Sequence, residues 1–390
     1  MGRAWIGVDI GKEFHWALAI DEGGKELLSR RVNNEEADLE MLITEARGLG
    51  LDLLWAMDMN HGPATLLVAL LLAVGQDVVY VPGLLVNRCR TAFVGESKTD
   101  RKDARVIAEN ARMRHDLARF SVRDELVVSL RLLVERRRDL VCDRTRTIER
   151  LRAVLLQISP ALERTLNPRF HGPLVLLARY QTPAAIRRSG QKRIATFLKS
   201  HGVIKSEALA ARAVEAAHRQ QIALPGEDTA GALVGRMATE LLALEDALAI
   251  ATRELEACFF SHPQAAILMS LPGMGACLGA EFLAAVGDVT RFASAGRLAA
   301  YAGLAPVSRD SGKVQGRLVR ARTGNRSLKF ALYQSAFCSL SVDPVSRAYY
   351  DRKRDEGKTH GQALIALARR RTDVLWAMLR DEARYRRVAA

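Results

Sequence analysis

Four aspartates occupy positions from which their carboxylates can converge on one point. Asp9 ends the apolar stretch WIGVD, and Asp58 ends the apolar stretch LLWAMD. Asp100 and Asp103 lie three residues apart where a helix is expected to begin, so they share one face of its first turn. Converging carboxylates repel one another without cations between them, so the set favours a metal site. Each aspartate alone also fits a helix cap or a turn, and the prediction depends on all four.

The elements that must position these acids follow from hydrophobic periodicity. Strands are expected at 4–10, 14–21, 26–32, 51–57 and 77–82, and helices at 35–49, at 63–74 and from Thr99, as its cap, to about 115. Residues 83–98 are expected to form a loop. This order predicts a meander followed by right-handed crossovers, which is the ribonuclease-H-like α/β arrangement. The first strand would then lie centrally beside the fourth, with Asp9 and Asp58 as neighbours.

Two long helices are expected after this domain. The first covers 124–158 with heptad-like leucines interrupted by Arg137 and Arg144, and the second begins at a cap formed by Asp228 or Thr229. Between them, five prolines divide 159–227 into short helices. The pattern predicts an antiparallel coiled-coil arm with an inserted lobe. Simple packing within the chain and a dimerisation arm both fit it.

Charge is unevenly distributed along the chain. The formal net charge is +14, and residues 291–390 hold 21 Lys and Arg against 8 Asp and Glu, or +13. The first 290 residues are nearly neutral, at +1. A basic C-terminal quarter indicates a polyanionic partner, although a solvated basic surface is the simpler alternative.

Two motifs in the C-terminal part fit nucleic-acid binding. LPGMGACLGA joins two apolar helices through a turn bearing Gly273 and Gly275, as in a helix-hairpin-helix whose N–H groups bind phosphate; a turn used only for packing is the alternative. From Arg309 to Lys329 there are seven basic residues and one acid, which predicts a flexible basic loop. The predicted phosphate-binding residues there are Arg309, Lys313, Arg317, Arg320, Arg322, Arg326 and Lys329. Ser311 lies among them and could attack phosphorus, or be an ordinary loop serine.

Several classes of protein are disfavoured. Five dispersed cysteines without a C-x-x-C pair argue against a disulfide framework and a zinc site, and favour reduced thiols in the cytoplasm. No signal peptide is expected, and the longest apolar run, 66–74, is too short to span a bilayer, so no membrane is expected as a partner.

Taken together, these motifs resemble bacterial DEDD transposases of the insertion-sequence family numbered one hundred and ten. The resemblance covers nearly the whole chain, and it is carried by VDIGKEFH, WAMDMNHGPATLL, GESKTDRKDARVIAE, LPGMGACLGAEFLAAVGDVTRF, YAGLAPVSRDSGK and RTGNRSLKFAL. One departure is that the second acid, commonly Glu in the family, is Asp58 here. Its carboxylate is one methylene shorter, which affects the metal distance or ligand mode.

The resemblance implies a three-part protein that moves DNA. Its parts would be a resolvase-like catalytic domain (1–120), a coiled-coil arm with an inserted lobe (121–262, lobe about 159–227) and a mainly α transposase domain (263–390). Asp9, Asp58, Asp100 and Asp103 would bind Mg²⁺, with Mn²⁺ as the alternative, and Ser311 would attack DNA. The family implies double-stranded donor and target DNA, a noncoding bridge RNA as guide, and a homo-oligomer, dimer or tetramer.

Three other functions remain open. VDIG also resembles the first phosphate loop of sugar-kinase and chaperone-type ATPases, but the sequence contains neither a second Asp-x-Gly loop nor G-x-x-x-x-G-K-[ST]. A noncatalytic nucleic-acid-binding protein would use the acids only as caps. A structure-selective junction endonuclease is the nearest competitor, and the role of Ser311 distinguishes it from a recombinase.

Overall fold

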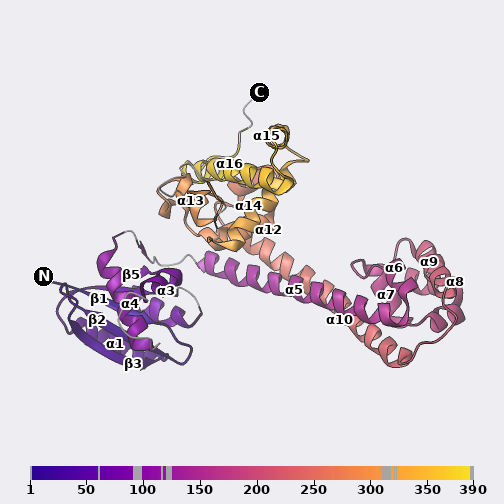
Figure 1. Ribbon diagram of the computed structural model, residues 1–390, viewed down its shortest axis with the longest axis horizontal. Coiled ribbons are helices and arrows are strands. Elements are labelled where there is room, and N and C mark those ends of the chain that lie inside the picture. The colour runs from indigo at the N-terminus through magenta and orange to yellow at the C-terminus, as the bar shows by residue number, and fades with distance from the viewer. Residues whose placement is uncertain are drawn as a thin grey trace, which may run out of the picture. The chain divides into compact units, whose positions relative to one another are not determined.

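The computed structural model describes residues 2–59, 62–90, 99–115, 117–119, 125–308, 318–319, 321 and 323–386. The chain divides into two compact units, Met1–Arg123 and Asp124–Ala390, and the second contains both the predicted arm and the predicted C-terminal domain (Figure 1).

The N-terminal unit is an α/β structure. Its strands are β1 (Arg3–Asp9), β2 (Phe14–Ile20), β3 (Glu26–Asn33), β4 (Asp52–Met57), β5 (Asp77–Tyr80) and the two-residue β6 (Ala118–Arg119). Its helices are α1 (Glu36–Arg47), the 3-10 turn η1 (Gly62–Ala64), α2 (Thr65–Ala73), α3 (Gly83–Arg90) and α4 (Asp100–Met113).

The six strands form one sheet in the order β3-β2-β1-β4-β5-β6. β1 is antiparallel to β2 and parallel to β4, with Val8 opposite Met57 at the carboxyl ends of both strands. The expectation that the first strand lies beside the fourth is therefore confirmed.

Helices cover both faces of this sheet because the strand residues alternate between the two cores. Ile6 and Val8 of β1 face the core shared with α1 and α2, which also contains Trp55 of β4. On the other face, Leu18 of β2 packs with Ala104 of α4. The alternation explains why period-2 patterns located these strands in the sequence.

Residues 83–90 depart from the expectation. They were predicted to belong to a loop, but they form α3, and Val86 is buried in the same core as Val79 of β5 and Ile107 of α4. Burial of Val86 between a strand and a helix, with Leu85 and Cys89 packed against the same core, stabilises a segment whose own sequence has little helical pattern.

The C-terminal unit is mainly helical. Its elements are α5 (Glu125–Ile158), α6 (Pro160–Thr165), α7 (His171–Arg179), α8 (Pro183–Ser200), α9 (Ser206–His218), α10 (Glu227–Phe260), α11 (Ala265–Ser270), α12 (Ala276–Val286), η2 (Val289–Arg291), α13 (Ala295–Tyr301), β7 (Val307–Ser308), β8 (Leu318–Val319), α14 (Arg326–Ser339), α15 (Pro344–Asp355) and α16 (His360–Arg380).

The helices α5 and α10 run antiparallel along their length (Figure 1). The arginines that interrupt the leucine pattern of α5 bind across to α10: Arg137 Nε donates to Thr252 Oγ1 at 3.1 Å and Arg144 Nη2 donates to Glu245 Oε1 at 3.3 Å. Polar contacts thus fix the register where apolar residues are missing.

The predicted cap of α10 was wrong. Gly226, at φ 80°, is the N-cap, and the Glu227 carboxylate accepts a hydrogen bond from the N–H of Leu224. A left-handed glycine turns the chain directly into the helix, so neither Asp228 nor Thr229 is needed as a cap.

Two cores lie at opposite ends of the α5/α10 pair. At one end, Leu155 and Leu241 join the core of a helical lobe formed by α6 to α9. At the other end, Leu130 and Phe259 join the core of α11 to α16. Within the described part of the chain, no helix is both long and apolar enough to cross a membrane.

Candidate active site

The first two acids stand at the same edge of the sheet. Asp9 is the last residue of β1, and Asp58 directly follows β4. The residues that precede them, Val8 and Met57, are register partners. Because parallel strands end together at one sheet edge, the two carboxylates leave neighbouring positions there.

A glycine allows the helix with the other two acids to approach this edge. A Cβ on Gly7 would lie 2.1 Å from the carbonyl oxygen of Ala104 and 2.4 Å from the backbone nitrogen of Ala108. Backbone of α4 therefore packs directly on β1, which only glycine permits. This contact places the first turn of α4 next to the strand end.

The first turn of α4 is set by its predicted cap. The Thr99 side chain accepts a hydrogen bond from the N–H of Lys102, which confirms Thr99 as the N-cap. Asp100 is exposed, whereas Asp103 is 7% exposed. Acids in a first turn are stabilised by the free N–H groups of the helix end.

Three of the four predicted acids line one pocket. This pocket of about 370 Å³ is lined by Asp9, Ile10, Gly11, Lys12, Glu13, Phe14, Trp16, Asp100 and Asp103. Its remaining walls come from the turn between β1 and β2 and from the start of β2. Lys12 and Glu13 were not predicted as site residues, and the signal that could have found them is their place in the motif VDIGKEFH, three and four residues after Asp9.

Asp58 does not line this pocket, but its carboxyl is close enough to interact electrostatically with Asp103, which does. Burial raises the pKa of the Asp58 carboxyl, and the nearby Asp103 carboxylate raises it further, against a lowering by a backbone hydrogen bond. Its Oδ1 is buried and has no hydrogen-bond partner among the described residues. A buried carboxylate in this state is costly unless a cation or a proton reaches it.

The four acids lie in one region, but their carboxylates are not arranged as a complete set of metal ligands. Among the residues that the structure describes, no three acidic, histidine or cysteine side chains stand close enough together to hold a metal ion. The oxygen donors and the unpartnered Asp58 Oδ1 fit a hard divalent cation in their chemistry.

The predicted helix-hairpin-helix is present as α11, a glycine turn and α12. Gly273 has φ 78°, and a Cβ there would lie 2.5 Å from the backbone nitrogen of Ser339 in α14. The buried Arg371 guanidinium donates to the carbonyl of Pro272 in the same turn. Gly273 thus serves close packing, while Gly275, the exposed N-cap of α12, remains at the surface.

Most of the predicted basic loop lies outside the described residues. This applies to Ser311 and to Arg309, Lys313, Arg317, Arg320 and Arg322. The predicted loop also extended too far, because Arg326 and Lys329 belong to α14. Arg326 is exposed, and the Lys329 ammonium donates to the carbonyl of Gly303 at 2.7 Å.

Two glycines join the ends of the chain segment that contains Ser311. A Cβ on Gly303 would lie 2.5 Å from the Thr323 carbonyl oxygen, and one on Gly324 would lie 2.6 Å from the Gly303 nitrogen. Both have positive φ, at 66° and 126°. The adjacent Asn325 donates from its backbone N–H to the Tyr301 carbonyl at 2.8 Å. Residues 301–303 and 323–325 therefore pack backbone against backbone.

Comparison with known proteins matches both parts of the chain to transposases. Residues 6–160 match a transposase family described by a DEDD motif and IS110, and residues 265–351 match the transposase IS116/IS110/IS902 family.

Relatives from insertion elements match almost the whole chain. It is 50% identical to the 44.8 kDa protein of insertion element IS116 of Streptomyces clavuligerus, over 97% of this chain and 95% of that protein. It is 48% identical to the 42 kDa protein of IS900 of Mycobacterium paratuberculosis, over 98% and 96%. A third relative, the 43.6 kDa protein of IS110 of Streptomyces coelicolor, is 37% identical over 97% and 94%.

Proposed function

Since this chain belongs to the IS116/IS110/IS902 family of transposases, which act on DNA by cleavage and strand transfer, we propose that it excises and inserts a double-stranded DNA element. The observation that carries the proposal is the pocket where Asp9, Asp100 and Asp103 meet, with Asp58 beside it.

The four carboxylates would hold Mg²⁺ or Mn²⁺ when DNA is bound. Asp9, Asp100 and Asp103 would offer oxygens from the pocket wall, and the unpartnered Asp58 Oδ1 would complete the set. Bound there, divalent cations would neutralise charge on the scissile phosphate.

Ser311 is the proposed nucleophile. Its oxygen would form a bond to phosphorus, its proton would pass to a base or water, and the deoxyribose oxygen would leave, so that the strand stays linked to the protein. The interlocked glycines at 303 and 324 support this role, because they fix the ends of the segment that presents the serine. The basic residues predicted around it would bind the phosphate backbone.

The remaining assignments concern architecture and partners. The strand order supports a ribonuclease-H-like, resolvase-like domain at 1–120, and the antiparallel α5/α10 pair supports a coiled-coil arm within 121–262. We place the transposase domain at 263–390. The active form would be a dimer or tetramer in which acids and serine meet across subunits, with a noncoding bridge RNA selecting donor and target DNA.

The test is a strand-transfer assay with labelled donor and target DNA and RNA transcribed from the DNA flanking the gene. Wild-type protein with Mg²⁺ should yield recombinant DNA and a covalent protein–DNA adduct. Ser311→Ala should lose the adduct, and Asp103→Asn should lose cleavage by about a thousandfold, while both still bind DNA. Omitting the RNA or chelating the metal should stop the reaction.

Two results would redirect the proposal. Recombination by Ser311→Ala would remove the serine from its role. Cleavage of four-way junctions by Ser311→Ala, without an adduct and without RNA, would instead favour a junction endonuclease that uses the acidic pocket alone.

A further inference from the structure

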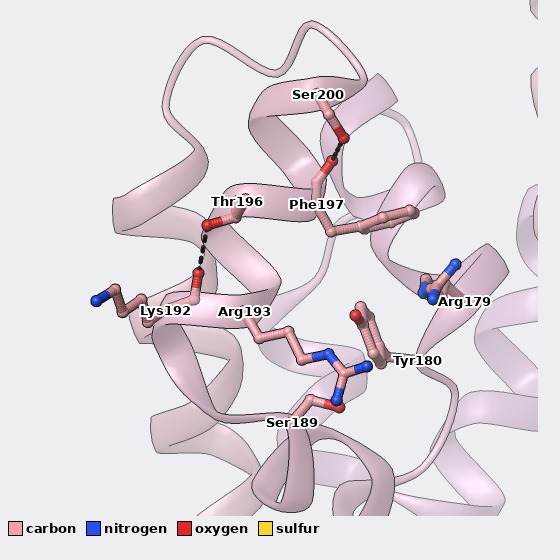
Figure 2. Close-up of a pocket in the computed structure, with 8 residues that line it drawn as sticks. All are labelled: Arg179, Tyr180, Ser189, Lys192, Arg193, Thr196, Phe197 and Ser200. Carbon is pink, nitrogen blue, oxygen red and sulfur yellow. Dashed lines mark hydrogen bonds between the residues drawn. The ribbon is translucent and has the colours of Figure 1, made fainter.

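A second site lies on the helical lobe, far in sequence from the acids and the serine. The lobe lies between the two ranges matched to transposase families, 6–160 and 265–351. It carries an open cleft of about 510 Å³, which is within the size range of small-molecule and cofactor sites. The cleft is lined by Arg179, Tyr180, Ser189, Lys192, Arg193, Thr196, Phe197 and Ser200 (Figure 2).

One wall of the cleft is aromatic. The rings of Tyr180 and Phe197 meet edge to face with their centroids 5.6 Å apart. The Arg179 guanidinium lies 5.0 Å from the Phe197 centroid, in cation–π geometry. Aromatic rings next to arginine offer stacking and charge at one place, which is a combination suited to a nucleotide.

The other wall is basic and available for binding. Lys192 and Arg193 are exposed on α8, and Figure 2 shows Arg193 extending toward Tyr180, opposite Arg179. Among the residues described, no carboxylate forms an ion pair with Arg179, Lys192 or Arg193. Their positive charge is therefore not neutralised locally.

A break in α8 shapes the basic wall. Gly190 has φ 69° and ψ 163°, so the helix stops there and a new turn begins with Gln191. Lys192 and Arg193 thus stand at the start of a helical segment, where backbone N–H groups and the helix dipole also favour an anion.

The surrounding sequence extends this charge. From Thr165 to Ser206, 42 residues contain eight Lys and Arg and no Asp or Glu. The eight are Arg169, Arg179, Arg187, Arg188, Lys192, Arg193, Lys199 and Lys205. The net charge of residues 1–290 is nevertheless only +1, because acidic residues elsewhere in that range offset these eight positive charges.

We propose that this cleft binds single-stranded nucleic acid. An unpaired base would stack against the partly exposed ring of Phe197, which the largely buried Tyr180 supports edge to face, and the adjoining phosphates would bind Lys192 and Arg193. A duplex would present only its backbone, because paired and stacked bases cannot reach the aromatic wall. The shared chemistry is that of RNA and DNA single strands, and the site acts independently of the acidic pocket and of Ser311.

Site-resolved photocrosslinking tests the proposal on the full-length protein. The probes are a twelve-nucleotide RNA with one 5-iodouridine, the corresponding DNA with 5-iododeoxyuridine, and that DNA annealed to its complement. Adducts are mapped by mass spectrometry. We expect both or one of the single strands to label Tyr180 or Phe197, and the higher yield to identify the preferred strand. The duplex should label them at least about tenfold less, because stacking needs an unpaired base.

Two matched double variants distinguish binding in the cleft from nonspecific attraction to the positive charge of the lobe. Lys192→Ala/Arg193→Ala should reduce the adduct about tenfold. Arg188→Ala/Lys199→Ala removes the same charge from exposed positions on the same helix, outside the cleft, and should leave the adduct nearly unchanged.

Three outcomes would overturn the proposal: no adduct between residues 179 and 200 with any probe, equal labelling by the duplex, or equal loss in the two double variants. The crosslink should persist in Ser311→Ala, so failure of the transposition chemistry would not be mistaken for failure of this site.

Discussion

In the N-terminal unit the acids stand on regular elements, whereas in the C-terminal unit Ser311 stands on a segment that joins two short paired strands, β7 and β8. A glycine contact is central to both regions. Gly7 lies under α4 in the middle of a sheet, while Gly303 and Gly324 meet at the ends of a connecting segment.

The two glycine contacts hold the functional residues near them in different ways. The Gly7 contact is part of the packing between sheet and helix, so the acids cannot be displaced without disturbing a core. The contact between Gly303 and Gly324, the Gly303–Gly324 clamp, consists of a few backbone contacts, and the Lys329–Gly303 hydrogen bond lies beside it. Under the proposed function, this clamp would position Ser311. The acidic pocket depends on packing throughout its unit, whereas the proposed serine site would depend on this local clamp.

Gly7→Ala should have the largest effect on this comparison. Its Cβ would overlap backbone of α4, which cannot move away as a flexible side chain could, so we expect a loss of about 3 kcal/mol in the stability of the N-terminal unit. Thermal denaturation and limited proteolysis would measure it. The control is Gly83→Ala, because a Cβ there meets no described atom within 4 Å. Equal stability of the two variants would contradict the proposed contact.

Gly303→Ala should cost less stability but act selectively. A left-handed alanine with a close carbonyl contact should destabilise the clamp by about 2 kcal/mol. We expect loss of the Ser311 adduct with little change in the melting temperature of the N-terminal unit. Gly296→Ala in α13 is the control, since it has ordinary φ and no contact closer than 3.6 Å. An unchanged adduct yield would show that the clamp does not position the serine.

The smallest effect on stability is expected from neutralising two partly buried carboxyls, those of Asp58 and Glu281. Burial raises the pKa of Glu281 on α12, as it does for Asp58, although Arg138 and Arg137 oppose the shift at Glu281. When the pKa of a carboxyl is higher in the folded protein than in the unfolded chain, the folded state holds the proton more tightly. The free energy of unfolding then falls as the pH rises from the unfolded pKa through the folded pKa. Asp58→Asn and Glu281→Gln should therefore each raise Tm by about 2 °C at pH 7.5, with no gain below pH of about 4.

Activity then separates these two acids. Asp58→Asn should abolish DNA cleavage while stabilising the fold, whereas Glu281→Gln should retain cleavage. If Asp58→Asn kept full cleavage, Asp58 would be a structural acid like Glu281 and the proposed ligand set would contain three carboxylates.

The sequence predicted those parts of the molecule that depend on short-range periodicity. Apolar stretches located β1, where they mostly alternate, and β4, where they run without a break from Leu53 to Met57. The pairing of the two strands then brought Asp9 and Asp58 to one edge. Helix α3 was missed because its stability comes from Val86 packing on distant elements rather than from its own pattern. The cap of α10 was misplaced because Gly226 adopts a left-handed conformation that residue preferences at caps do not reveal. The contact of Gly273 with α14 depends on tertiary packing and could not be read from the sequence, and its role in phosphate binding stays a prediction.

The antiparallel helix pair also sets a length. α5 and α10 each contain 34 residues, so the pair is about 50 Å long at 1.5 Å per residue. That equals about fifteen base pairs of duplex at 3.4 Å each. The two cores that pack on this helix pair are closer than its full length, because Val134 of α5 belongs to the core of α11 to α16 and Ile148 of α5 belongs to the core of the lobe, about 21 Å along the helix. A duplex that contacted both regions on one subunit would therefore have to span between about six and about fifteen base pairs, which limits the spacing of the sequences that one subunit can bind.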